Sequence, residues 1–233
     1  MQVIAIILSL VLLIYVAYRG YSVILFAPVF ALGAAAFSGL DVMPAFSELF
    51  MLRLAAYVKN FFPLFMLGAV FGKVMDATGA AKAIAHWILQ KLGPSRAILS
   101  VILSAAVLTY GGVSLFVVAF AIYPFAAAIF REGNIPKRLI PGTIAAGSFT
   151  FTMTALPGSP QIQNMIPAKY FGTTAYAAPV TGIFASVFIF TAGLMWLEWR
   201  RKKAQAAGEG YGNHTKAEPE KKIDESTLPN PLL

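Results

Sequence analysis

The residues in this sequence that could do chemistry are hydroxyl and amide side chains beside two interruptions of long apolar runs. The first interruption is Gly111-Gly112, flanked by Thr109 and Ser114, inside residues 97–130, which carry no charge. Adjacent glycines are a poor way to continue a helix. The run is therefore predicted to form two helical limbs that meet at a polar tip, where hydroxyl groups can hydrogen-bond a ligand.

The second interruption is the sequence PGSP at residues 157–160, inside the uncharged run 139–168. Each proline removes a backbone donor and disfavours the helical conformation of the residue before it. The helix that begins at Leu139 is therefore predicted to stop near Leu156. A new helix is predicted to start with Ser159 as its N-cap and Pro160 in its first turn.

The composition indicates a membrane protein, because 58% of the 233 residues are hydrophobic and only 12% are charged. A soluble domain has about 25% charged residues. Several uncharged runs approach or exceed the length of a membrane span, and the first of them lacks the features of a cleaved signal peptide. The predicted fold class is an all-α polytopic membrane protein. The lack of cysteine excludes disulfides, thiolate metal sites and thiol catalysis.

Lysine and arginine beside the spans indicate which ends face the cytoplasm. The cluster RRKK at residues 200–203 places the end of the last span inside, and basic residues place both flanks of residues 97–130 on the same side. The limbs 97–110 and 113–130 would be about 21 Å and about 27 Å long, against a hydrocarbon core of about 30 Å. We therefore predict a re-entrant hairpin; two complete spans joined by a tight turn are the alternative.

The same charges predict a topology of about five spans plus the hairpin, with the N-terminus outside and the tail in the cytoplasm. Residues 80–92 are predicted to form an amphipathic helix on the cytoplasmic surface, with Ile84, Trp87, Ile88 and Leu92 on its apolar face. Residues 1–199 would form the membrane domain and residues 200–233 a disordered cytoplasmic linker or tail. The net charge of +8 is accounted for by this topology, so nucleic acid is not an expected partner. The five spans are 3–18, 22–40, 58–74, the broken helix 139–168, and 174–197.

Two breaks at membrane depth predict a transporter binding site, because unpaired backbone is tolerated there only beside protein or a water-filled cavity. Helices that restart at both breaks would direct their N-termini toward one anion. Glycines that serve only close packing, and an ordinary external loop at the prolines, are the simpler alternatives. The predicted substrate-binding residues are Thr109, Gly111, Gly112, Val113, Ser114, Thr154, Pro157, Gly158, Ser159, Gln161, Gln163 and Asn164.

The stretch that begins YGGVSLF and ends TALPGSPQIQN, residues 110–164, resembles the gluconate permease (GntP) family of bacterial symporters, within the ion transporter superfamily. The resemblance covers residues 67–197 and implies an inner-membrane carrier that imports gluconate or related hydroxy acids together with protons. It also implies that Gly111, Gly112, Ser114 and residues 157–164 belong to the substrate region.

Members of that family are about twice as long as this chain and contain two inverted halves joined by a cytoplasmic linker. The resemblance therefore implies one half of an inverted-repeat transporter. A second half-chain or a homo-oligomer is the expected protein partner. An N-terminal fragment, a frameshifted gene and one subunit of a split carrier are the three explanations of the length. A structural or assembly subunit without transport of its own is the alternative function.

No cofactor or metal is expected. No catalytic residue is expected either, since no nucleophile is paired with a base. A channel is also not expected, because the sequence contains no charge ring. The coupling ion is expected to be a proton, from the resemblance, although the uncharged segments contain no Asp, Glu or His to relay it. Hydroxyl and carbonyl oxygens at the tips also suit sodium, which is the alternative coupling ion.

Overall fold

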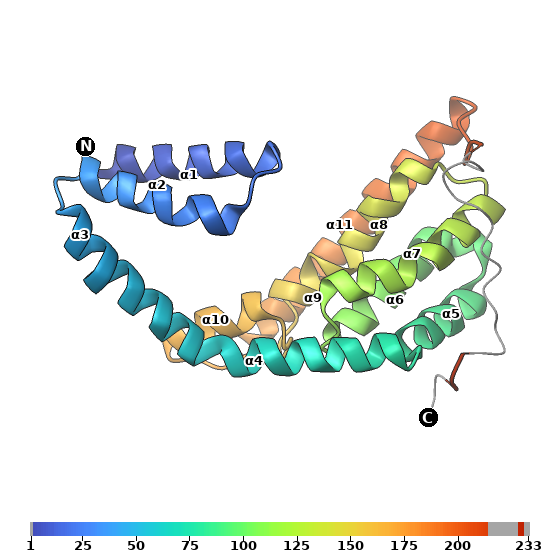
Figure 1. The fold of residues 1–233 in the computed structure, drawn as a ribbon. Helices are drawn as coiled ribbons and strands as arrows, with labels where there is room; N and C mark the ends of the chain where they lie inside the picture. The colour runs from blue at the N-terminus through green and yellow to red at the C-terminus, as the bar shows by residue number, and fades with distance from the viewer. Residues whose placement is uncertain (1, 214–227, 231–233) are drawn as a thin grey trace. The chain divides into compact units, whose positions relative to one another are not determined.

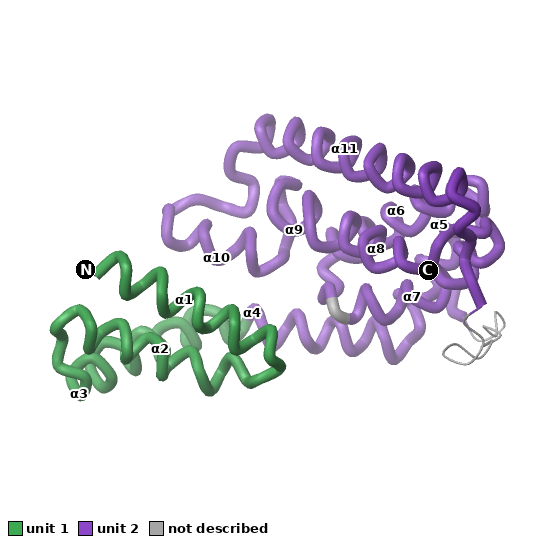
Figure 2. Tube along the Cα trace, turned by 90° about the horizontal axis from the view of Figure 1, so that it is seen from above, with its two compact units in different colours: residues 1–63 green, residues 64–233 purple. Residues whose placement is uncertain are grey.

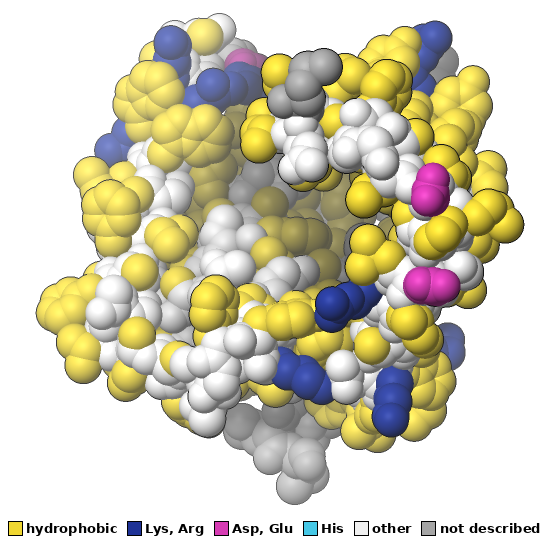
Figure 3. Space-filling model, turned by 90° about the vertical axis from the view of Figure 1, so that its left-hand side faces the viewer, with side chains coloured by type: hydrophobic (Ala, Val, Ile, Leu, Met, Phe, Trp, Pro, Cys, Tyr) yellow, Lys and Arg dark blue, Asp and Glu magenta, His cyan; other side chains and the backbone are white. Residues whose placement is uncertain are grey.

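The computed structural model describes residues 2–213 and 228–230, and every regular element within them is helical (Figure 1). The chain forms two compact units, residues 1–63 and 64–233 (Figure 2). Hydrophobic side chains dominate the face drawn in Figure 3, where charged side chains are few. Such an apolar exterior requires an apolar environment.

The first unit contains α1 (Gln2–Tyr18) and α2 (Val23–Phe37), which pack against each other. The hydroxyl of Ser9 donates a hydrogen bond to the carbonyl of Phe30 at 3.1 Å. The two helices occupy the first two predicted spans, but at 17 and 15 residues they would be about 26 Å and about 23 Å long. They are therefore shorter than a hydrocarbon core of about 30 Å.

A longer helix follows the short helix α3 (Val42–Pro44) and a π-helical stretch, Ala45–Phe50. α4 (Met51–Ala77) exceeds the predicted span 58–74 at both ends. By length and composition, the continuous helix Val42–Ala77 and α11 (Pro179–Ala206) can cross a membrane, and α5 with α6 would count as a third span. The predicted number of five spans is therefore not confirmed in the described residues.

The core of the second unit is built around α6 (Ala97–Tyr110), which has the bounds predicted for the first limb of the hairpin. α5 (Ala80–Leu92), α7 (Leu115–Glu132), α8 (Ile140–Ser148) and α11 all pack against it. Ser100 and Ser104 on α6 are buried, but their hydroxyls donate to the carbonyls of Arg96 and Ser100, each at 2.9 Å. Because these polar groups have partners, α6 can be enclosed on most sides at little cost.

α5 is bent by 101° from the helix that contains α6. α5 therefore lies roughly perpendicular to α6, the first limb of the hairpin. Its buried face differs from the predicted one, since Trp87 is 39% exposed and Ile88 is the one predicted apolar residue that is buried. The small side chains on the buried face allow α5 to approach α6 and α7 closely. That face consists of Ala81, Ala83, Ala85, Ile88 and Leu89.

The predicted broken helix is divided into α8, α9 (Phe151–Thr154) and α10 (Ile162–Phe171). The prolines end the helical structure at Thr154, close to the predicted position, but an additional break lies at Phe149 and Thr150. The hydroxyls of Ser148, Thr150 and Thr152 donate to backbone carbonyls at 2.8, 2.6 and 2.6 Å. Such bonds compete with the helix and bend it, which accounts for the additional break.

Residues 207–213 fold back onto the second unit after α11. The side chain of Tyr211 is 4% exposed, and its backbone N–H donates to Oδ1 of Asn134 at 3.0 Å. Glu209 accepts two hydrogen bonds from the guanidinium of Arg138, at 2.5 and 2.6 Å. The prediction of disorder from residue 200 is therefore wrong as far as residue 213, because buried aromatic area and a bidentate ion pair offset the entropy of ordering. Residues 214–227 and 231–233 lie outside the described residues.

We expect the replacement of Gly147 by alanine to lower the free energy of unfolding by about 1–3 kcal/mol. A Cβ at Gly147 would overlap the carbonyl of Ile102 and lie 2.6 Å from the Cβ of Ala105. Thermal unfolding of the purified chain in detergent measures the effect. Gly193→Ala is the matched control, because its nearest neighbour is 4.0 Å away and alanine is favoured over glycine within a helix. An equal loss of stability in both variants would contradict the close packing of α6 and α8.

We expect acid to release residues 208–213. The side-chain hydrogen bond with Arg138 is the main reason that the pKa of Glu209 is lowered in the folded chain. The contribution of this carboxylate is therefore complete above its ordinary pKa of about 4.3 and lost as the pH falls through the lowered value. Hydrogen exchange of the Glu209 and Tyr211 amides, corrected for intrinsic rates, should show loss of protection in that range. Glu209→Gln should remove this pH dependence, whereas Glu198→Gln, which alters a separate ion pair with Arg201, should retain it.

Candidate functional site

The tip of the α6–α7 hairpin is a tight turn that uses Gly112 with a φ of +92°. Its N–H donates to the carbonyl of Thr109 at 3.1 Å, and the N–H of Val113 donates to the carbonyl of Leu108 at 3.0 Å. These two bonds form a Schellman motif, in which glycine is favoured because its φ is positive. The N–H of Val113, a predicted binding residue, is therefore engaged within the turn. Free donors belong to the first turn of α7, after its N-cap Ser114.

At the second break too, polar side chains form hydrogen bonds with the backbone of the break and its neighbours. Ser159 is fully buried, and its hydroxyl donates to the carbonyl of Thr152 at 2.6 Å. The predicted N-cap is thus wrong: α10 begins at Ile162 with Gln161 as its N-cap residue. Asn164 donates through Nδ2 to the carbonyls of Ser159 and Ala175, at 2.9 and 3.2 Å. These side chains hold the shape of the break.

The two breaks lie in contact, although about fifty residues separate them in the sequence. Nε2 of Gln161 donates to the carbonyl of Thr109 at 2.8 Å and to that of Val113 at 3.3 Å. The hydroxyl of Tyr110 donates to the carbonyl of Pro157 at 2.9 Å. Pro160 packs against Gly112, with its Cγ 3.5 Å from the place that a Cβ would take. Hydrogen bonds and van der Waals contact therefore join the tip to the second break.

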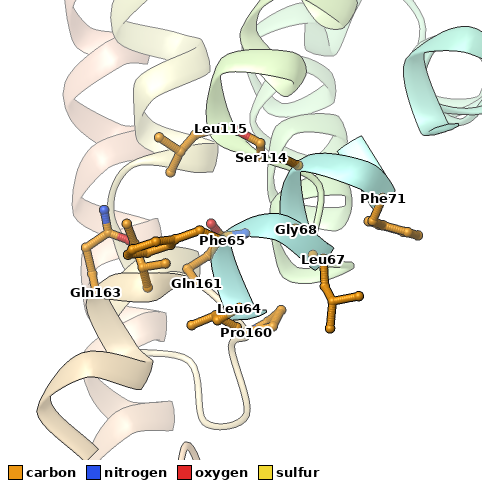
Figure 4. Close-up of a pocket in the computed structure, with 13 residues that line it drawn as sticks. Leu64, Phe65, Leu67, Gly68, Phe71, Ser114, Leu115, Pro160, Gln161 and Gln163 are labelled. Carbon is orange, nitrogen blue, oxygen red and sulfur yellow. The ribbon is translucent and has the colours of Figure 1, made fainter. Parts of the chain in front are cut away.

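A cavity of about 390 Å³ lies beside this junction, between α4, the beginning of α7 and the beginning of α10 (Figure 4). Its volume is in the range of small-molecule sites, about 300–1,000 Å³. α4 supplies an apolar wall from residues of the second unit, and the other two elements supply the polar groups. The lining residues are Leu64, Phe65, Leu67, Gly68, Ala69, Phe71, Gly112, Ser114, Leu115, Pro160, Gln161, Ile162 and Gln163.

The first turns of α7 and α10 both border the cavity, through Leu115 and Ile162. The N–H groups in a first turn have no partner within their helix, and the helix dipole adds partial positive charge there. None of the described residues that line the cavity is charged. The polar side chains of the lining are Ser114, Gln161 and Gln163. This arrangement can bind a small anion through neutral donors.

Four of the predicted binding residues line the cavity: Gly112, Ser114, Gln161 and Gln163. Thr109 and Val113 take part in the junction through their carbonyls. Gly158, whose N–H donates to the carbonyl of Ala175 at 2.8 Å, Ser159 and Asn164 instead hold the second break in shape. Thr154 is separate from both, since it is exposed and its hydroxyl donates to the carbonyl of Thr150 at 3.2 Å. Gly111 and Pro157 contribute backbone bonds, as donor to Val107 and as acceptor from Tyr110. The assignment of these residues to substrate binding stays a prediction.

The wall formed by α4 was not predicted. Its one local signal is a pair of glycines a helical turn apart, Gly68 and Gly72. A Cβ at Gly72 would lie 3.5 Å from Val117 and 3.7 Å from Ser114, so α4 closely approaches the beginning of α7. Small residues at this spacing allow such an approach.

One hydroxyl at the junction differs from its neighbours. Thr109 is fully buried, and its Oγ1 has no hydrogen-bond partner among the described residues. By contrast, the buried hydroxyls of Ser104, Thr143 and Ser148 donate to backbone carbonyls one turn earlier. In the described part of the chain, no group of three or more His, Cys, Asp or Glu residues could hold a metal ion.

Comparison with known proteins places this geometry in a family. The sequence matches the GntP family permeases over residues 1–231. It is 58% identical over 213 residues to "Uncharacterized transporter YxjC" of Bacillus subtilis (strain 168), an alignment that covers 91% of this chain and 45% of that protein. The chain thus spans about half the length of this curated relative. No solved structure matches. The helical chain with its apolar exterior belongs to the GntP permease family of membrane transporters.

Proposed function

We propose that this chain contributes the substrate site of a secondary transporter for hydroxylated organic anions of the gluconate class. The observation that carries the proposal is the convergence of two helix N-termini, at Leu115 and Ile162, on one uncharged cavity. A carboxylate in that cavity would accept hydrogen bonds from the first turns of α7 and α10. Ser114 and Gln163, which line the same cavity, would bond the hydroxyl groups of the substrate.

Neutral donors suit a transporter because the site must also release its ligand. A buried arginine would bind a carboxylate through two charge-assisted hydrogen bonds, and its own charge would be costly to leave unpaired after release. Backbone N–H groups at a helix terminus carry only partial charge. The empty site is therefore less costly than one that contains a buried cation.

We propose a proton as the coupling ion, in keeping with the family resemblance of the sequence. None of the described residues that line the cavity is titratable, so the proton would travel on the substrate or through groups elsewhere. Sodium is the second candidate. The unpartnered Oγ1 of Thr109 favours it, because hard cations bind oxygen ligands.

Uptake of radiolabelled gluconate tests the proposed function in bacteria that lack their own gluconate carriers. The chain is expressed alone and together with the part of the Bacillus subtilis relative that the alignment does not cover. Uptake above the vector control in either arrangement supports the proposal. A protonophore should abolish proton-coupled uptake, whereas replacement of sodium by potassium should abolish sodium-coupled uptake. No uptake in either arrangement, with both proteins present in the membrane, would overturn the proposal.

We expect Gly68→Leu to reduce uptake at least about tenfold by occupying the cavity, a loss of about 1.4 kcal/mol or more. A Cβ at Gly68 would meet no described atom within 4 Å, so the larger side chain can be accommodated without unfolding. Gly33→Leu is the matched control, because that glycine also lies within a helix and has no described atom within 4 Å of the same position. Equal uptake by the two variants would remove this cavity from the transport path.

We expect the two glutamines that line the cavity to have different roles. Gln161→Leu removes the donor to two carbonyls of the tip and should lower the free energy of unfolding by about 1–3 kcal/mol as well as reduce uptake. Gln163 is exposed and makes no hydrogen bond to a described residue. Gln163→Leu should therefore leave thermal unfolding unchanged and raise the KM for gluconate. Unchanged stability of Gln161→Leu would contradict a stabilising role for the hydrogen bonds of Gln161 to the tip.

A further inference from the structure

The last turns of α11 carry two pairs in which a cation lies over an aromatic ring. The guanidinium of Arg200 lies 5.4 Å from the ring centre of Trp196, and Nζ of Lys203 lies 5.3 Å from that of Trp199. These distances are within the range of cation–π attraction, about 6 Å. Each ring therefore holds a flexible cationic side chain in place.

All four residues lie along one stripe on the side of α11, where Trp196, Trp199 and Lys203 are exposed and Arg200 is half-buried. Their positions, 196, 199, 200 and 203, follow the i, i+3, i+4, i+7 spacing of a single helical stripe. Trp196 and Trp199 are 54% and 53% exposed, whereas Leu197 and Ala204 on the inward side are 2% and 3% exposed. We call these four residues the Trp–cation stripe.

The face of α11 beside the stripe is apolar toward the beginning of the helix. Phe184, Phe188 and Met195 are 73%, 72% and 66% exposed, and α11 is long and apolar enough to cross a membrane. Exposed tryptophans mark the interface between hydrocarbon and headgroups. The Trp–cation stripe therefore begins at the depth where lipid phosphates lie.

The acidic side chains near the stripe have other partners. Glu198 pairs with Arg201 at 2.7 Å, and Glu209 binds Arg138 through two hydrogen bonds. Arg200 lies near enough to Glu209 to contribute, after Arg138, to lowering its pKa. Neither Arg200 nor Lys203 forms an ion pair with an acidic side chain in the described residues. Lys203 is exposed and Arg200 is half-buried.

We propose that the Trp–cation stripe binds the phosphate of an anionic phospholipid headgroup. Cβ atoms three residues apart on a helix are about 5–6 Å apart, so Arg200 and Lys203 can approach one phosphate together. A guanidinium can donate two hydrogen bonds to a phosphate, and the ammonium adds a point charge. The tryptophan rings contact the adjoining glycerol and upper acyl carbons, which suits their place at the interface.

Quenching of tryptophan fluorescence by brominated lipids tests the proposal with the 233-residue chain. Trp87→Phe leaves Trp196 and Trp199 as the only reporters, since the sequence contains three tryptophans. The variant is reconstituted in phosphatidylcholine vesicles that contain increasing fractions of brominated phosphatidylglycerol or, separately, brominated phosphatidylcholine. We expect phosphatidylglycerol to be preferred at least about fivefold, as one lysine or arginine near an anionic surface provides. High salt should reduce the preference.

The charge substitutions identify the site. Arg200→Gln with Lys203→Gln should abolish the preference. Lys202→Gln removes a charge from the same turn but lies off the stripe, so it should retain most of the preference. Equal quenching by the two lipids in the parent, or an equal loss in Lys202→Gln, would overturn the proposal. Native mass spectrometry of retained phosphatidylglycerol, with circular dichroism for helix content, distinguishes loss of binding from loss of folding.

Discussion

The hydrogen bonds from the amide of Gln161 to the carbonyls of Thr109 and Val113 join the two interruptions of the chain. Carbonyls at the end of a helix lack a partner within the helix; that of Thr109 accepts from Gly112 within the turn, and Gln161 adds a second donor from the other interruption. With the tip attached to the second break in this way, the first turns of α7 and α10 face the same space. The proposed anion site depends on that single junction, because neither helix terminus alone would make one.

Close packing around α6 provides the surroundings that this junction needs. Gly147 brings the backbone of α8 against Ile102, and the alanines of α5 cover another side of α6. Backbone that departs from helical geometry at membrane depth is stable only where protein or enclosed water surrounds it. The small residues of α5, α6 and α8 therefore contribute to the site without lining it, and polar groups such as Ser100 and Ser104 are satisfied by their own helix.

Charged side chains at the C-terminal end of the second unit make two kinds of contact. Toward the protein, Glu209 binds Arg138, and the ring of Tyr211 lies under Arg131 at 5.3 Å. Farther back along the chain, Arg200 and Lys203 are held over tryptophan rings on the side of α11. The C-terminal part of the second unit thus binds the helical core through Glu209 and Tyr211. In the proposed lipid site, Arg200 and Lys203 of the same part bind the headgroup.

Local chemistry determined much of this protein from the sequence alone. The helix 97–110, the turn at Gly111-Gly112 and the break at the prolines follow from glycine, proline and the lack of charge, and the structure has all three. Tertiary structure decided which donors stay free, that Gln161 rather than Ser159 precedes α10, and that α4 forms one wall of the cavity. It also decided the order of residues 207–213. These outcomes depend on contacts between residues tens of positions apart, and neither hydrophobic periodicity nor backbone propensity contains information about such contacts.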